Sequence, residues 1–241
     1  MKKVFTSILA LLVFSISTQA QFYHKKIKGN GHLTTKTRTV GDYNKIGVAG
    51  SFNVELIKGT EGEITIQAEE NLMDYIITDV KDGQLKIKTK KGYQIKSTKK
   101  IKITIPFSDV DAISLAGSGN IYTTQTIKAK ELQLAVAGSG GMNLNISTGQ
   151  VNTSISGSGN MKLQGDSNQF SCKIAGSGNL NGYNLKANIA NAKVAGSGNI
   201  KIHAMNEIHA KIAGSGNIYY TGNPEIVKSN SAGSGSIKKK H

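Results

Sequence analysis

The chain has 241 residues, with 30 Lys and Arg against 15 Asp and Glu, and a formal net charge of +15. This excess of positive charge favours anionic partners, such as phosphate-rich lipids, acidic polysaccharides or nucleic acid. The only cysteine is Cys172, which excludes an intramolecular disulfide. A hydrophobic content of 38%, with 28 Gly and no Trp, suits a fold of many thin layers better than one large core.

Residues 1–20 have the pattern of a secretory signal peptide. Lys2 and Lys3 give a positive start, an apolar stretch follows over residues 4–16, and Ala20 supplies a small residue before the expected cut. The apolar stretch is shorter than the roughly 20 residues that a membrane anchor needs. We therefore expect an exported protein of the periplasm, the cell surface or the medium, with no transmembrane segment in the mature chain. Export makes nucleic acid an unexpected partner.

Residues 21–40 have no sustained pattern, which predicts an extended, flexible leader. Over residues 41–110, apolar and polar residues alternate in several short runs, which predicts β-strands. Asp82-Gly83 is a strong hairpin signal, and residues 69–77 could form one short helix. The stretch VAGSFN at 48–53 looks like a degenerate copy of a corner that recurs later in the chain, so we expect coiling to begin there.

The triplet Gly-Ser-Gly recurs through residues 111–237 at intervals of 21, 19, 19, 20, 18 and 19 residues. Internal periodicity near 20 residues indicates a solenoid. The first glycines of the seven triplets are Gly117, Gly138, Gly157, Gly176, Gly196, Gly214 and Gly233. We expect each triplet to mark one structural corner, because glycine tolerates both positive φ and close approach of another backbone.

Aligning the repeats on the triplet places apolar residues in columns that alternate with polar ones. The column two residues before the triplet contains Leu115, Val136, Ile155, Ile174, Val194 and Ile212. This period of two is typical of a strand with one buried face. The sequence therefore predicts an all-β protein, a parallel β-helix with about 19–20 residues per turn. Its handedness does not follow from the columns.

Asparagine follows the triplet in five of the seven copies: Asn120, Asn160, Asn179, Asn199 and Asn217. Asparagines stacked at about 4.8 Å from turn to turn can form hydrogen bonds along the stack. The serines of the triplets are not expected to be nucleophiles. A hydrolase needs one activated hydroxyl with a positioned base, whereas seven equivalent serines argue for a structural role.

Several segments in order resemble one bacterial family: YNKIGVAGSFNVELIKG, ENLMDYI, DGQLKIK, KITIPFSDVDAISLAGSGNI and the later triplets. Over about residues 42–235 the chain is similar to the putative auto-transporter adhesin, head GIN domain family of exported proteins. The resemblance implies a right-handed single-stranded parallel β-helix. It implies no catalytic residues, and the adhesin function that it suggests is an analogy.

The residues available for chemistry are few after Ala112: four carboxylates, namely Glu131, Asp166, Glu207 and Glu225, and no Arg. A glycan-cleaving site needs clustered carboxylates or a bound cation, so we expect a non-enzymatic protein. A carbohydrate-active enzyme, a polysaccharide lyase or hydrolase on a β-helix, is the alternative. His203 and His209 have no third ligand nearby in sequence, so neither a metal nor a cofactor is predicted. Cys172 is expected to be a small buried core residue.

Lysines form two outward columns in the alignment. Lys173, Lys193 and Lys211 stand three residues before a triplet on consecutive turns, and Lys162 and Lys201 stand five residues after the first glycine. One interpretation is a solubilising face. The other is an electropositive strip that binds an anionic polysaccharide or lipid head groups, in an adhesion or binding module. A third possibility is a partnership with an envelope protein. The basic tail, 238–241, is expected to discourage pairing at the open end of the stack.

Overall fold

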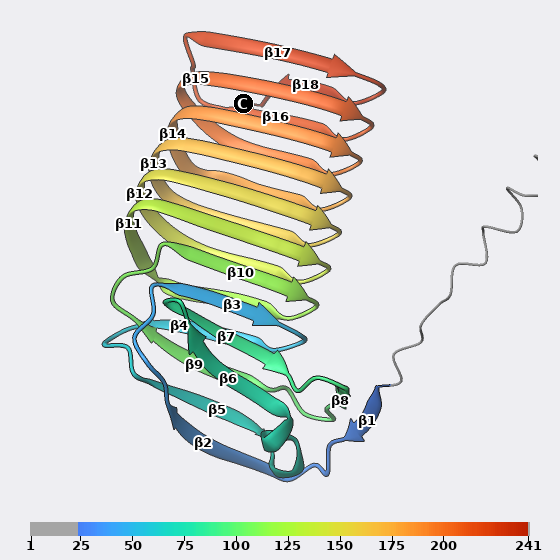
Figure 1. The fold of residues 1–241 in the computed structure, drawn as a ribbon. Coiled ribbons are helices and arrows are strands. Elements are labelled where there is room, and N and C mark those ends of the chain that lie inside the picture. Colours follow the sequence, from blue (N-terminus) through green and yellow to red (C-terminus); the bar gives the residue numbers. More distant parts are fainter. Residues whose placement is uncertain (1–23, 241) are drawn as a thin grey trace, which may run out of the picture.

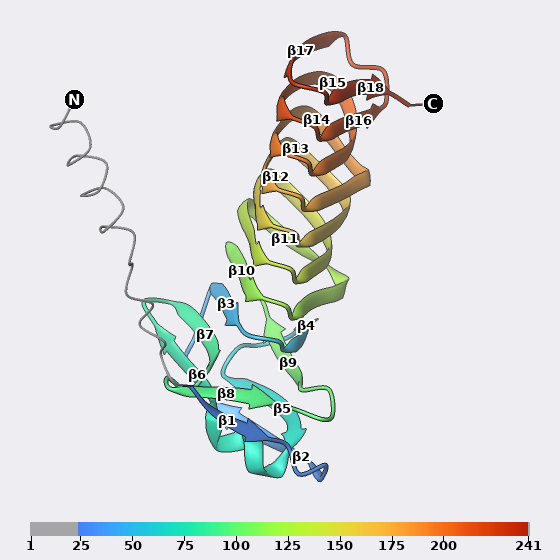
Figure 2. The same ribbon diagram turned by 90° about the vertical axis from the view of Figure 1, so that its right-hand side faces the viewer.

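The computed structural model describes residues 24–240, so the predicted signal peptide lies outside the described part. The chain winds into a stack of parallel turns that stands on a smaller N-terminal base (Figures 1 and 2). The stack is built by β10 (Ala112–Gly117), β11 (Asn120–Gly138), β12 (Gly141–Gly157), β13 (Asn160–Gly176), β14 (Asn179–Gly196), β15 (Asn199–Gly214), β16 (Asn217–Thr221), β17 (Ile226–Ala232) and β18 (Ser236–Lys239). The predicted all-β parallel solenoid is confirmed.

Successive turns pair in the register that the triplets predict. Gly117 pairs with Gly138, and the alignment continues through the triplets of the following turns. Ile174, Val194 and Ile212 are direct neighbours in one column. From β11 to β15, each turn is one long bent strand that runs from triplet to triplet.

The interior of the stack consists of single-file apolar columns. The residues two before each triplet, from Leu115 to Ile212, are between 1% and 4% exposed. A second column runs Val151, Phe170, Ala190, Ile208, so a large ring lies beside a methyl group on the next turn. Burying a side chain of the size of Val or Ile contributes about 1.5–3 kcal/mol. The core of medium-sized side chains thereby holds each turn to its neighbours.

The corner at Gly196 shows why the triplet recurs. Its φ is +124°, and a Cβ atom there would lie 2.5 Å from the carbonyl oxygen of Gly176 on the previous turn. That same carbonyl accepts the N–H groups of Ser197 and Gly198 at 2.9 and 3.0 Å. A Cβ atom on Gly198 would lie 2.3 Å from the carbonyl oxygen of Gly178. Turn-to-turn packing therefore excludes side chains from both glycine positions.

Asparagine side chains form the predicted ladder beside the corners. Asn217 donates to Asn199 at 3.0 Å, Asn199 to Asn179 at 2.8 Å, and Asn179 to Asn160 at 3.1 Å. Ser236 continues the ladder by donating its hydroxyl to the Asn217 amide oxygen at 2.8 Å. These side-chain hydrogen bonds join consecutive turns and add to the backbone pairing.

The base contains the remaining elements: β1 (Lys25–Lys28), β2 (Leu33–Thr39), β3 (Lys45–Ala49), β4 (Asn53–Lys58), β5 (Glu63–Glu69), the 3₁₀ helix η1 (Glu70–Tyr75), β6 (Ile76–Lys81), β7 (Gln84–Thr89), β8 (Tyr93–Lys96) and β9 (Lys102–Phe107). β3 and β4 form one turn of the stack, because Gly50 between them takes a φ of +142° and stacks under the corner at Gly117. The lowest turn is out of sequence order. β7 lies under β3 and β9 under β4, while β10 and β11 lie above them.

Two local predictions for the base are confirmed. Asp82 and Gly83 have φ values of 53° and 69° and close the antiparallel hairpin between β6 and β7. The expected short helix is η1. Both elements close the lower end of the stack, where β2 also pairs antiparallel with β5 (Figure 1).

The flexible leader expected over residues 21–40 is wrong for most of that segment. β1 pairs with β8 and β2 pairs with β5, so residues 25–28 and 33–39 are strands. Their partners lie 24 to 68 residues further along the chain, which is why the local pattern did not reveal them. At the other terminus, Lys238 and Lys239 of the expected tail belong to β18, which pairs with β16.

Candidate functional site

Lys173, Lys193 and Lys211 form one column on the outside of β13, β14 and β15. They are exposed, and the strand register pairs Lys173 with Lys193 and Lys193 with Lys211. Parallel pairing sets neighbouring turns about 4.8 Å apart. Within residues 24–240, none of these three ammonium groups lies within 4.0 Å of a carboxylate oxygen. We refer to these three residues as the lysine strip.

Like charges in direct register repel one another and destabilise a sheet. Ser154 precedes the lysine strip in the column and Asn230 follows it, so both ends of the strip are neutral. Because no neighbouring carboxylate neutralises the three charges, all three ammonium groups are available to an external anion.

A shallow groove of about 650 Å³ runs beside the lysine strip. Its apolar lining includes the outward methyl groups of Ala175, Ala195 and Ala213, which pair in register two residues beyond the lysines. The groove therefore combines a row of cations with a flat methyl floor. Such a surface can hold an elongated anion along the solenoid axis, with its charges over the lysines and apolar atoms over the alanines.

Lys162 and Lys201 lie in a different column, on the other side of the Gly-Ser-Gly corner. They are not adjacent, because Asn181 separates them, and Tyr219 follows Lys201. The Lys201 ammonium lies 5.8 Å from the centre of the Tyr183 ring. The groove along the lysine strip does not include either residue, so the structure does not bring the five predicted lysines into one site.

The four carboxylates of the repeat region are spread over several turns. Glu131 and Glu207 share a column, but Gln150, Gln169 and Ile189 stand between them. Asp166 accepts a hydrogen bond from Ser147 at 2.9 Å. Glu207 contacts His209 and lies 4.0 Å from Lys228, and the backbone N–H of Glu225 donates to Asn206. Glu225 directly precedes Ile226, the residue that pairs with Glu207, whereas Glu131 and Asp166 lie on other turns.

The histidines have local partners. His203 Nδ1 lies 3.0 Å from the Thr221 hydroxyl, and His209 contacts Glu207. Within residues 24–240, no three His, Cys, Asp or Glu side chains are grouped as a metal site would require. Cys172 is buried as predicted, and burial raises the pKa of its thiol to about 12, against a smaller opposing effect of a hydrogen bond with Thr153.

A second group of lysines was not singled out from the sequence. It lies on β1, β8 and the loops next to β8, where segments 25–28 and 88–102 meet. The available signal was composition, because residues 88–102 contain seven lysines and no carboxylate. No helix of the described residues is long and apolar enough to span a membrane.

A family model described as "Putative auto-transporter adhesin, head GIN domain" matches residues 42–224. Among solved structures, a "putative adhesin" from Bacteroides fragilis NCTC 9343 is 27% identical with a TM-score of 0.83, over 89% of this chain and 100% of that chain. A "putative lipid binding protein" from Parabacteroides distasonis ATCC 8503 is 30% identical with a TM-score of 0.75, over 90% and 100%. A "putative adhesin" from Parabacteroides merdae ATCC 43184 is 25% identical with a TM-score of 0.67, over 90% and 100%. No curated protein matches the chain.

Proposed function

The chain belongs to the family described as "Putative auto-transporter adhesin, head GIN domain", and from this premise we propose that it is an exported, non-enzymatic binding module whose lysine strip holds an anionic ligand. The observation that carries the proposal is the register of Lys173, Lys193 and Lys211 on three consecutive turns. Three uncompensated charges in a row weaken the fold, and an anion bound along them would relieve their repulsion.

The form of the groove supports an elongated ligand. The lysines repeat at about 4.8 Å along the axis of the stack, and the alanine floor runs parallel to them. An acidic polysaccharide offers regularly spaced carboxylates, and an anionic lipid offers a charged head group with an apolar chain. The relative from Parabacteroides distasonis, named a "putative lipid binding protein", supports the lipid as one of these two ligands.

The test replaces Lys173, Lys193 and Lys211 together with Gln and measures equilibrium binding to alginate, a polyuronate, and to a soluble anionic lipid. Each lost contact between a cation and an anion weakens electrostatic binding, so we expect at least a tenfold loss for one of the two probes. The probe that is affected identifies the ligand class. Circular dichroism should be unchanged, because all three side chains are exposed.

A matched control keeps the net charge equal while moving the change to another side of the stack. Lys128, Lys130 and Lys186 are also exposed lysines of the repeat region and lie outside the groove. Replacing these three with Gln should leave binding within about twofold of the parent protein. Equal losses in both triple variants would show that net charge alone attracts the anion, which would contradict the proposal. Alginate cleavage by the parent protein would instead favour the polysaccharide lyase or hydrolase alternative.

A further inference from the structure

The base of the protein carries a second concentration of positive charge, on the two-stranded sheet of β1 and β8 and its flanking loops. Segments 25–28 and 88–102 together hold ten lysines and no carboxylate. Two of these lysines are in ion pairs, Lys88 with Asp79 at 3.9 Å and Lys102 with Glu55 at 3.6 Å. The other eight have no carboxylate oxygen within 4.0 Å in the described chain.

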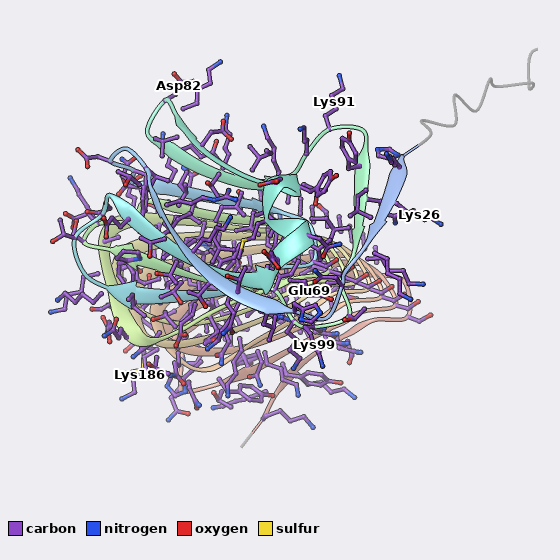
Figure 3. All side chains as sticks on the ribbon, turned by 90° about the horizontal axis from the view of Figure 1, so that it is seen from below. Lys26, Glu69, Asp82, Lys91, Lys99 and Lys186 are labelled. Atoms are coloured by element: carbon purple, nitrogen blue, oxygen red, sulfur yellow. The ribbon has the colours of Figure 1, made fainter. Side chains whose placement is uncertain are left out.

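The strand register gathers part of this charge on one face. Lys28 pairs with Lys96, and Lys26 pairs with Gln94, and all four side chains are exposed. Between them, Ile27 and Ile95 face the other way and pack against the core. Figure 3 shows Lys26, Lys91 and Lys99 projecting outward around this side of the base. We name the exposed group the basic platform: Lys26, Lys28, Lys90, Lys91, Lys96, Lys99 and Lys100.

One buried carboxylate fixes the platform to the rest of the molecule. Glu69, at the end of β5, is 0% exposed and accepts hydrogen bonds from the Gly31 N–H at 2.7 Å, the Thr98 N–H at 2.8 Å and the Thr98 hydroxyl at 2.7 Å. Gly31 follows β1 and Thr98 follows β8, so Glu69 holds the exit of both strands. Glu69 also accepts the backbone N–H of Lys99 at 3.3 Å, so it ties both segments of the platform to β5.

An aromatic pair lies within the platform. The rings of Tyr75 and Tyr93 are 4.7 Å apart at 52°, and the Lys90 ammonium lies 5.8 Å from the Tyr93 centre. Both tyrosines are half-buried. Tyrosine is enriched at the boundary between a membrane and water, because it combines an apolar ring with a polar hydroxyl.

We propose that the basic platform docks the base of this protein onto an anionic phospholipid surface. The lysines spread over two strands and two loops, a breadth that suits a plane of mobile head groups better than a single polymer chain lying in a row. Clusters of four to eight lysines or arginines near a bilayer bind anionic lipids in this way. The platform lies on the base, whereas β13 to β15 lie further along the stack (Figure 2), so the platform and the lysine strip are separate surfaces.

The test measures co-sedimentation of the full chain, after removal of residues 1–20, with two kinds of vesicle. One kind contains phosphatidylcholine alone, and the other contains phosphatidylcholine and phosphatidylglycerol at 7:3. We expect binding only to the anionic vesicles, and less binding as salt rises. Replacing Lys26, Lys28 and Lys96 with Gln should weaken vesicle binding at least tenfold, because these three share the outward face. A second variant, with Lys90, Lys91 and Lys99 replaced by Gln, should show a similar loss.

The triple variant of the lysine strip is the internal control. It should keep its affinity for anionic vesicles within about twofold, while the platform variants should keep their binding to alginate or to the soluble lipid. Both platform variants should have melting temperatures close to that of the parent protein, because the replaced lysines are exposed. This measurement shows that a loss of binding does not come from unfolding. Full vesicle binding by the platform variants would overturn the proposal. A loss in the strip variant alone would also overturn it, and would assign membrane binding to the lysine strip.

Discussion

Glu69 shows how one residue couples the fold of the base to pH. Burial alone would raise the pKa of its carboxyl, but hydrogen bonds from Thr98, Gly31 and Lys99 outweigh burial and lower the pKa to about 2, from 4.5. A carboxyl whose pKa is lower in the folded state stabilises that state above its unfolded pKa. The stabilising effect of Glu69 is therefore complete above about pH 5 and is lost as pH falls from 4.5 towards 2.

Replacing Glu69 with Gln should destabilise the protein by about 1–3 kcal/mol at neutral pH, because buried N–H donors lose their charged acceptor. Urea unfolding at pH 7 and at pH 3 measures this effect. The difference between the parent protein and the variant should shrink at pH 3, where part of the advantage of the ionised carboxylate is gone. The same measurement on Glu70→Gln, an exposed neighbour, is the control. An unchanged difference at the two pH values would contradict the role given to Glu69.

Among the elements of the stack, β12 is the one that interrupts the asparagine ladder. It begins with Gly141 where the strands on either side begin with Asn120 and Asn160. Gly141 has no positive φ. A Cβ atom there would lie 2.9 Å from Oδ1 of Asn120, the end of a flexible side chain, and 3.6 Å from the Asn160 carbonyl oxygen. An asparagine at this position therefore fits after rotation of one amide.

Replacing Gly141 with Asn should stabilise the protein by about 1–2 kcal/mol, through new ladder hydrogen bonds and a less flexible unfolded chain. Thermal unfolding should show a melting temperature raised by about 2–8 °C for a domain of this size. Gly141→Ala separates the two contributions, because alanine changes the unfolded chain and adds no amide. An Asn variant no more stable than the Ala variant would show that the ladder contributes nothing measurable.

Elements inside the repeat could be predicted from the sequence, whereas those of the base could not be fully predicted. In the stack, every residue meets its equivalent on the next turn, so an alignment of Ile174, Val194 and Ile212 is already a map of contacts. The strands β1 and β2 have no such equivalents, and their partners are distant in sequence. The basic platform could not be predicted for the same reason, because its two segments come together only through the pairing of β1 with β8.

The same logic sets what could be predicted of the candidate site. The alignment predicted the lysine strip, because Lys173, Lys193 and Lys211 occupy equivalent positions. It did not predict that the corner would place Lys162 and Lys201 apart from the strip. An alignment shows which residues share a column, but not the angle between the two faces that meet at the corner. Nor did it predict the role of Glu69, because its hydrogen-bond donors lie in two separate loops, one after β1 and one after β8.

At the scale of the whole molecule, the turns repeat in register. A single substitution on the next turn can therefore lengthen a column of exposed side chains by one residue. Stability in such proteins accrues between adjacent turns, so exposed positions can be changed without disturbing distant turns. Ser154 and Asn230 occupy the two ends of the lysine column and are exposed. The central claim is that this column is the binding site for an anion, and it can therefore be tested by lengthening the column.

The most direct measurement is the affinity for the anionic probe of a double variant, Ser154→Lys with Asn230→Lys, across a range of salt concentrations. The account predicts binding at least tenfold tighter than that of the parent protein and a steeper loss with salt, because five aligned cations replace three. A control of equal net charge, Thr124→Lys with Asn184→Lys, adds its lysines at exposed positions outside the groove and should bind like the parent. Equal affinity of the two double variants, or no gain from the longer column, would contradict the account.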